Sequence, residues 1–202
     1  MKFELDKEKT KEFTGIINHI SQLINEVDFY FTKDGMEISA MDPANVAMVI
    51  LNIPKSYFLV YNVDQDTKVG INLVNLKSVL KRMDTLDVEV KDKITLRSKG
   101  KTIKEYSQPI IDTGVDKQKV PELNQETKIE IDEKVLKDTL ADVNIVSDAF
   151  ELEVTKDKVQ VKAEGDLNSV ECEVETVSHK GEAKTKYSLD YMQKLIGAGI
   201  EG

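Results

Sequence analysis

The segment Val27-Asp-Phe-Tyr-Phe-Thr-Lys-Asp-Gly-Met-Glu-Ile38 carries the pattern of a β-hairpin. Apolar and polar residues alternate on both sides of Asp34-Gly35, a dipeptide typical of tight turns between antiparallel strands. Thr32-Lys33-Asp34 recurs 123 positions later as Thr155-Lys156-Asp157. The sequence therefore predicts that one structural unit has been used twice along the chain.

The duplication extends to amphipathic segments on either side of the hairpin. The same offset pairs apolar residues of two predicted helices: Phe13 with Leu136, Ile17 with Leu140, and Ile20 with Val143. A shorter offset of 116 pairs a second set: Leu76 with Met192, Val79 with Leu195, and Leu80 with Ile196. Spacings of three and four residues place each set on one side of a helix, so all four helices are expected to pack by one face.

The remaining elements of each copy follow from the periods of the apolar residues. In copy one we expect helices over 7–24 and 72–83, with strands over 2–6, 27–32, 36–38, 46–53, 68–71, 86–91, 94–98 and 102–108. In copy two we expect helices over 134–143 and 189–196, with strands over 128–131, 151–155, 159–163 and 169–177. The connections are too short for crossover helices, which indicates antiparallel pairing and an α+β fold.

This organisation predicts two domains of unequal extent. Domain one spans 1–112, and domain two spans 128–202 without counterparts of the last three strands of copy one. Residues 113–127 are polar and contain a proline, a composition typical of a linker. We expect the absent strands to leave one sheet edge and part of the core of domain two uncovered.

The composition argues against membrane-spanning and secreted proteins. With 202 residues, 40% of them hydrophobic and 32% charged, the chain has the make-up of a soluble globular protein. It contains neither an apolar run of about 18 residues, as a membrane span requires, nor the apolar core of a signal peptide. The sequence thus predicts an intracellular protein that has no contact with a membrane.

Few residues are suited to catalysis or metal binding. Cys172 is the only cysteine, and the two histidines, His19 and His179, lie far apart in sequence. Acidic residues make up 37 of 202, so groupings such as Asp42 and Asp148 with nearby carboxylates are expected by chance and are more typical of turn and helix caps. We therefore predict no catalytic residue, no metal, no cofactor and no enzymatic activity.

The distribution of charge differs between the helices and the rest of the chain. The net charge is −9, yet the four predicted helices carry 9 basic and 6 acidic side chains. From the residues alone, two interpretations remain open. Lysines decorate most solvated helices, but a weakly basic surface could also contact phosphates without reading bases.

Several motifs together resemble one family. They are Leu23-Ile-Asn-Glu26, Ile38-Ser-Ala-Met-Asp-Pro-Ala-Asn-Val-Ala-Met48, Asn75-Leu-Lys-Ser-Val-Leu-Lys-Arg82, Val120-Pro-Glu-Leu123 and Val146-Ser-Asp148. In this order the chain resembles the DNA sliding clamp of archaea and eukaryotes, proliferating cell nuclear antigen, in a carboxy-terminally shortened form. The resemblance implies two clamp domains, with three subunits closed into a ring whose helices line the hole and whose sheets face outward.

The resemblance also implies a function. The protein would be a processivity factor that encircles double-stranded DNA, independently of sequence, as a homotrimer. DNA polymerase, ligase, nuclease and clamp loader would bind it through short peptide motifs. It would act in the cytoplasm, associated with the nucleoid, in an archaeon, or in the nucleus of a eukaryote. The alternative is a clamp-fold adapter that does not encircle DNA, or a subunit of a mixed ring.

By the same resemblance, three sets of residues have roles. The DNA-facing set is Lys11, Lys77, Lys81, Arg82, Lys134, Lys137 and Lys194. The partner-peptide groove is formed by Met41, Asn45, Val46, Met48, Val120 and Pro121. The subunit interface involves Lys104, Tyr106 and Gln108 on one edge and Glu171, Cys172 and Val174 on the other.

The chain departs from the family pattern in two places. Helix positions that are basic in relatives are here Thr14, Gly15, Ser21, Asp138 and Ala141, so a less basic bore is expected. The carboxy-terminal strand and tail that form a further wall of the groove have no counterpart. Without the family, Val46 and Met48 could equally be inward-facing strand residues.

Overall fold

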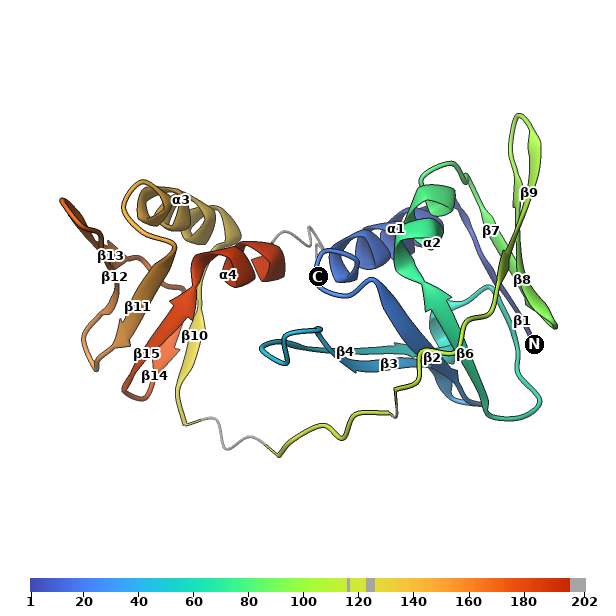
Figure 1. Ribbon diagram of the computed structural model, residues 1–202, viewed down its shortest axis with the longest axis horizontal. Coiled ribbons are helices and arrows are strands. Elements are labelled where there is room, and N and C mark those ends of the chain that lie inside the picture. Colours follow the sequence, from blue (N-terminus) through green and yellow to red (C-terminus); the bar gives the residue numbers. More distant parts are fainter. Residues whose placement is uncertain (116, 123–125, 197–202) are drawn as a thin grey trace. The chain divides into compact units, whose positions relative to one another are not determined.

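The computed structural model of the chain contains two compact units (Figure 1). It describes all residues except 116, 123–125 and 197–202. The first unit comprises Met1–Val120 and the second begins at Pro121. Each unit combines antiparallel sheets with two helices.

The first unit has two antiparallel sheets and helices α1 (Lys7–Ile20) and α2 (Leu73–Leu80). One sheet has the order β5-β1-β7-β8-β9, formed by Val60–Asn62, Lys2–Leu5, Leu86–Val90, Lys93–Lys99 and Ile103–Pro109. The other has the order β4-β3-β2-β6, formed by Met48–Pro54, Gly35–Met41, Glu26–Phe31 and Thr67–Asn72. A single 3-10 turn, η1 (Lys55–Tyr57), follows β4.

The second unit repeats this plan in part. A two-stranded sheet pairs β10 (Lys128–Glu130) with β14 (Ser178–Lys180). A four-stranded sheet has the order β13-β12-β11-β15, formed by Ser169–Val174, Val159–Glu164, Ala149–Val154 and Ala183–Ser188. Its helices are α3 (Glu133–Asn144) and α4 (Leu189–Ile196).

The hairpin that defines the repeat forms in both units with the same register. Phe31 pairs with Met36 in the first unit, and Val154 pairs with Val159 in the second. Gly35 adopts φ 155°, and a side chain there would collide with the Ile53 carbonyl, because its Cβ would lie 2.2 Å from that oxygen. The Tyr61 hydroxyl donates to the Gly35 carbonyl at 2.6 Å, and burial raises the pKa of Tyr61 to about 12.

The sequence missed the strands β5, β14 and β15, and several predicted boundaries were wrong. Helix α2 ends at Leu80 rather than residue 83, and β4 begins at Met48 rather than residue 46. The strand expected over 169–177 ends at Val174, where its pairing with β12 stops, and the chain turns so that Val177 donates to the Glu130 carbonyl. Strand β15 was not predicted, because Lys184, Thr185 and Lys186 give little apolar alternation; it forms by pairing with β11. Helix α1 ends at Ile20 rather than residue 24, with Ser21 as its C-cap.

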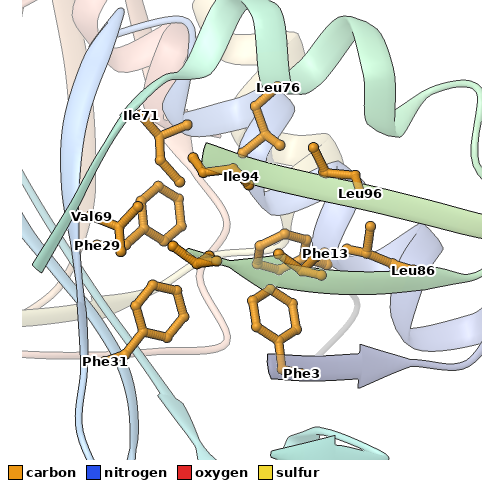
Figure 2. Close-up of a pocket in the computed structure, with 12 residues that line it drawn as sticks. Phe3, Phe13, Phe29, Phe31, Val69, Ile71, Leu76, Leu86, Ile94 and Leu96 are labelled. Atoms are coloured by element: carbon orange, nitrogen blue, oxygen red, sulfur yellow. The ribbon is translucent and has the colours of Figure 1, made fainter. Parts of the chain in front are cut away.

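The core of the first unit lies between its helices and sheets. Figure 2 shows Phe3 and Phe13 beside Phe29 and Phe31, surrounded by aliphatic residues of β6, α2, β7 and β8. The stacked pair Phe3 and Phe31 has ring centroids 5.9 Å apart. The void that remains measures about 20 Å³ and has an entirely apolar lining, which favours a dry interior.

The core of the second unit is much smaller. Among the described residues, its apolar cluster has nine buried members, against twenty-five in the first unit. Strand β1 pairs on both edges, with β5 and β7, whereas β10 pairs within the described chain only with β14. Leu195 on α4 remains 44% exposed. Within the described residues, β10 thus has one unpaired edge, and α4 leaves Leu195 partly exposed.

The unequal cores predict unequal stabilities. Ile17 and Leu140 are equivalent, fully buried helix residues, so replacing either by alanine should cost its own unit about 2–5 kcal/mol. Since the second unit has less apolar burial, we expect it to unfold at a lower urea concentration than the first. Leu140→Ala should increase the difference between the two unfolding midpoints, and Ile17→Ala should decrease it. Hydrogen exchange across a urea series measures both units separately. Earlier unfolding of the first unit in the unaltered protein would contradict this account.

Candidate functional site

The helices of the first unit begin at side-chain caps and expose a polar face. The Asp6 carboxylate accepts from the Lys9 amide at 2.8 Å at the start of α1, and the Asn72 side chain accepts from the Asn75 amide at 3.0 Å at the start of α2. The two helices are joined through Lys77, whose Nζ donates to the Ser21 hydroxyl at 3.2 Å.

The predicted DNA-facing cations divide into two groups. Within the described part of the chain, four are exposed and form no ion pair or hydrogen bond through their charged groups: Lys11, Lys81, Arg82 and Lys134. The others have local partners. Lys77 donates to Ser21, Lys137 pairs with Glu133, and Lys194 lies 2.6 Å from Asp190. The charged groups of these four cations would lose no existing partner on binding a phosphate.

Lys7, which is not among the predicted DNA-facing residues, lies beside two of them. Lys7 lies with Lys11 and Lys81 around an open hollow of about 520 Å³ between α1 and the end of α2. Its position in the sequence is unusual for a lysine. Lys7 is the first residue of α1, where the helix dipole favours acidic side chains and disfavours a cation. A lysine there gains little for the helix itself.

A second candidate surface is the outward face of the sheet β4-β3-β2-β6. Met41 pairs with Met48, and Ser39 with Ile50, so these side chains share one face of the sheet. The opposite face carries Val49 and Leu51, which pack against the core. Met48 therefore points away from the core, and the alternative of an inward-facing Met48 was wrong.

The loop between β3 and β4 is shaped by a buried carboxylate. Asp42 accepts hydrogen bonds from the amides of Val46 and Ala47, each at 2.7 Å, and from Ala44 at 3.1 Å. Asn45 adopts φ 57°, a left-handed conformation that asparagine tolerates. Asp42 thus caps a turn, and it holds Val46 in a loop position where that side chain is 64% exposed.

The start of the connector lies on this same face. Ile111 forms a bridge with Gly70 of β6, Thr113 bonds to Asp28 of β2, and the Ser39 hydroxyl of β3 donates to the Gln118 carbonyl at 2.7 Å. Between the connector and the β3–β4 loop is a hollow of about 210 Å³, whose lining includes Asp28, Tyr30, Met41, Asn45 and Val115.

The predicted groove residues are only partly brought together. Met41 and Asn45 line the hollow, Met48 lies beside Met41, and Val46 is on the adjoining loop. Val120 is exposed at the end of the first unit, and Pro121 belongs to the second. Ile50, which extends the Met41–Met48 apolar surface, was missed, although its even spacing from Met48 placed it on the same face.

Both predicted interface strands are edge strands. β9 ends one sheet and β13 ends another within the described residues, so each exposes unpaired backbone groups. Lys104, Tyr106 and Gln108 lie on the same face as buried Ser98, Leu96 and Ile94. Ile103, which is 84% exposed, was not predicted.

The three predicted residues of β13 do not share a face. Cys172 and Val174 lie opposite Val161 and Val159, on the inner face, and burial raises the pKa of the Cys172 thiol. Glu171 is on the outer face, where its carboxylate accepts from Gln160 Nε2 at 2.9 Å.

Neither a metal-binding cluster nor a membrane-spanning helix is found in the described part of the chain. In the described ranges, no three His, Cys, Asp or Glu side chains gather in a way that could hold a metal ion. None of the described helices combines the length and apolar character needed to cross a membrane.

Comparison with known proteins decides the family. Residues 2–119 match the model of the proliferating cell nuclear antigen, N-terminal domain. The DNA polymerase sliding clamp 1 of Thermococcus kodakarensis is 32% identical over 209 residues, covering 97% of this chain and 84% of the relative. The chain belongs to the proliferating cell nuclear antigen family. The sliding clamp of Pyrococcus furiosus is 31% identical over the same extent.

Solved structures confirm the predicted clamp fold. The Thermococcus kodakaraensis proliferating cell nuclear antigen superimposes with a TM-score of 0.91 at 22% identity, covering 100% of this chain and 86% of that one. The A. fulgidus clamp, solved with the carboxy-terminal region of FEN-1 bound, gives a TM-score of 0.82 at 27% identity, covering 98% and 82%. A PCNA2–PCNA3 complex from Sulfolobus tokodaii gives 0.84 at 24% identity, covering 98% and 85%.

Proposed function

We propose that this member of the family is a DNA polymerase sliding clamp, a ring that encircles duplex DNA and tethers replication and repair enzymes. The observation that carries the proposal is the extent of the match: relatives named DNA polymerase sliding clamp align with 97% of the chain. In this function the clamp is a scaffold without catalytic activity. It works on chromosomal DNA in the cytoplasm of an archaeal cell, as its Thermococcus and Pyrococcus relatives suggest.

The charge distribution supports sliding rather than tight binding. Lys7, Lys11 and Lys134 are exposed on helices, and Lys81 and Arg82 are exposed directly after α2, while the chain as a whole carries −9. A ring is held by topology, so each phosphate contact needs only weak attraction, and an acidic exterior repels duplex from the outer surface. Lys77, Lys137 and Lys194 contribute less, because neighbouring side chains already bind them.

The edge strands support assembly into a ring. β9 and β13 are open edges at the ends of their sheets, and antiparallel pairing between neighbouring subunits would satisfy the backbone groups of both. We propose that Lys104, Tyr106 and Gln108 face Cys172 and Val174 across this junction, since each set lies on the inner face of its sheet. Glu171 then lies on the outer face of the joined sheet.

Partner enzymes are proposed to bind the outward face of the first unit. The A. fulgidus clamp, solved with the carboxy-terminal region of FEN-1 bound, is the precedent for binding a terminal segment of another protein. Met41, Met48 and Ile50 offer an apolar surface beside the hollow under the connector, and flexible methionines suit a surface that accepts several partners. We also propose clamp domains over 1–112 and 128–202, joined by the connector over 113–127.

A non-encircling adapter, or a subunit of a mixed ring, remains the second candidate. The observation that favours it is the small core of the second unit, with β10 paired on one edge within the described residues. A second unit that is not stable alone would weaken a homotrimeric ring.

The oligomeric mass tests the ring directly. Three copies of the 22.8 kDa chain give about 68 kDa, and we expect this mass from multi-angle light scattering at micromolar concentration. Replacing Ser107 in β9 by proline should lower the mass, since proline breaks strand pairing, while Ser107→Ala, which keeps the backbone amide, is the control. A monomer under these conditions would contradict the homotrimer and favour the adapter.

The cations predict a graded salt dependence of DNA binding. Removing one phosphate contact should reduce the slope of log K against log salt by about 0.9. In a homotrimer each substitution is present three times, so we expect a loss of at least this size for Lys81→Ala and Lys11→Ala, measured by fluorescence anisotropy across a salt series. Lys137→Ala is the matched control, because its ammonium is already paired with Glu133 and should change the slope little. Equal effects of Lys81→Ala and Lys137→Ala would refute the division of the cations.

A further inference from the structure

One buried carboxylate fastens the start of the connector to the sheet beneath it. Asp28, on the outward side of β2, is 6% exposed. Its Oδ2 accepts from the Thr113 hydroxyl at 2.6 Å and lies 2.9 Å from Lys68 Nζ. A carboxylate so far removed from water is stable only when it is paired and hydrogen-bonded. The connector therefore supplies one of the two groups that contact Asp28 Oδ2, and Lys68 supplies the other.

Lys68 and Gly70 extend the attachment along β6. Lys68 Nζ donates to the Val115 carbonyl at 3.1 Å, so the same ammonium joins β2, β6 and the connector. The Ile111 amide donates to the Gly70 carbonyl at 3.0 Å. A side chain at position 70 would prevent this approach, because its Cβ would lie 2.1 Å from the Ile111 carbonyl oxygen. Residues 111–115 are thus held across two neighbouring strands.

These contacts shape the hollow described above. Thr113 and Val115 line it together with Asp28, Met41 and Asn45. The wall formed by the connector is in place only while residues 111–115 stay on the sheet. When the connector is already held on the sheet, binding of a partner loses less conformational entropy than when the connector is loose.

We propose that Asp28 is a positioning residue for partner binding: with Lys68 and Thr113 it forms a latch that holds the connector against β2 and β6 before a peptide arrives. The proposal rests on the function proposed above and deepens it. Asp28 itself need not touch the peptide. Lys68 and Thr113 act through the connector, whereas Met41 and Met48 offer the contact surface.

Thr113→Val tests the latch, because valine matches threonine in size but lacks the hydroxyl. Thr113→Ser keeps the hydroxyl and should restore the wild-type behaviour. Thr67→Val is the matched control: it removes a hydroxyl from β6 that donates at 2.9 Å to the Gln65 carbonyl, away from the connector. All three variants leave the apolar core unchanged. Thr113→Ser and Thr67→Val should keep the thermal midpoint of the first unit near that of the wild type. Thr113→Val takes a donor from the buried Asp28 carboxylate and should lower this midpoint by a few degrees.

Two measurements are needed. The first is hydrogen exchange at the Ile111 amide, which bonds to Gly70 and not to Thr113. We expect it to be about tenfold faster in Thr113→Val, the loss expected from one charge-assisted hydrogen bond. The second is the affinity for the carboxy-terminal FEN-1 peptide, measured by fluorescence polarisation. We expect it to fall about three- to tenfold as ordering costs rise.

The outcomes separate the latch from the function on which it rests. If Thr113→Val leaves hydrogen exchange at the Ile111 amide unchanged, the latch is overturned, regardless of the measured peptide affinity. Faster exchange with unchanged affinity overturns the positioning role. If the wild-type protein does not bind the peptide at all, the proposed partner function fails, and the role of Asp28 in partner binding fails with it. Hydrogen exchange at the Ile111 amide still shows whether Thr113 holds the connector on the sheet.

Discussion

The rest of this structure depends on one constraint, the alternation of side chains across the strands β2 and β3. Every second residue, such as Phe29 or Ile38, enters the core, and the residues between them, such as Asp28 and Ser39, face outward. The inward set joins the sheet to α1 and α2, and the outward set receives the connector. A shift of register by one residue would exchange the two faces and remove both the core and the candidate partner surface.

The second unit obeys the same alternation but uses its outward face differently. There β11, β12 and β15 carry a ladder of opposite charges, with Lys162 at 2.7 Å from Glu153 and Lys184 at 2.8 Å from Glu151. The hydrogen bond to Lys162 lowers the pKa of Glu153. Exposed pairs of this kind contribute little stability. The repeat has thus diverged so that only the first unit presents methionines and a connector on this face within the described residues.

The sequence predicted what local patterns determine and missed what tertiary pairing determines. The hairpin, the four helices and the two edge strands followed from periodicity and turn residues. Strand β15 has no apolar pattern of its own and exists because β11 offers an edge. The positions of Lys7 and Ile50 could be inferred from the sequence, but the contacts of Asp28 could not, because Thr113 and Lys68 meet it from distant parts of the chain.

The central claim is that the chain closes around DNA, and topology tests this most directly. The protein would be assembled on nicked circular DNA and on linear DNA of equal length and sequence, then passed over a sizing column at moderate salt. We predict that it stays on the circle and is lost from the linear duplex, since only free ends allow a ring to slide off. Equal retention on both DNAs would contradict encirclement.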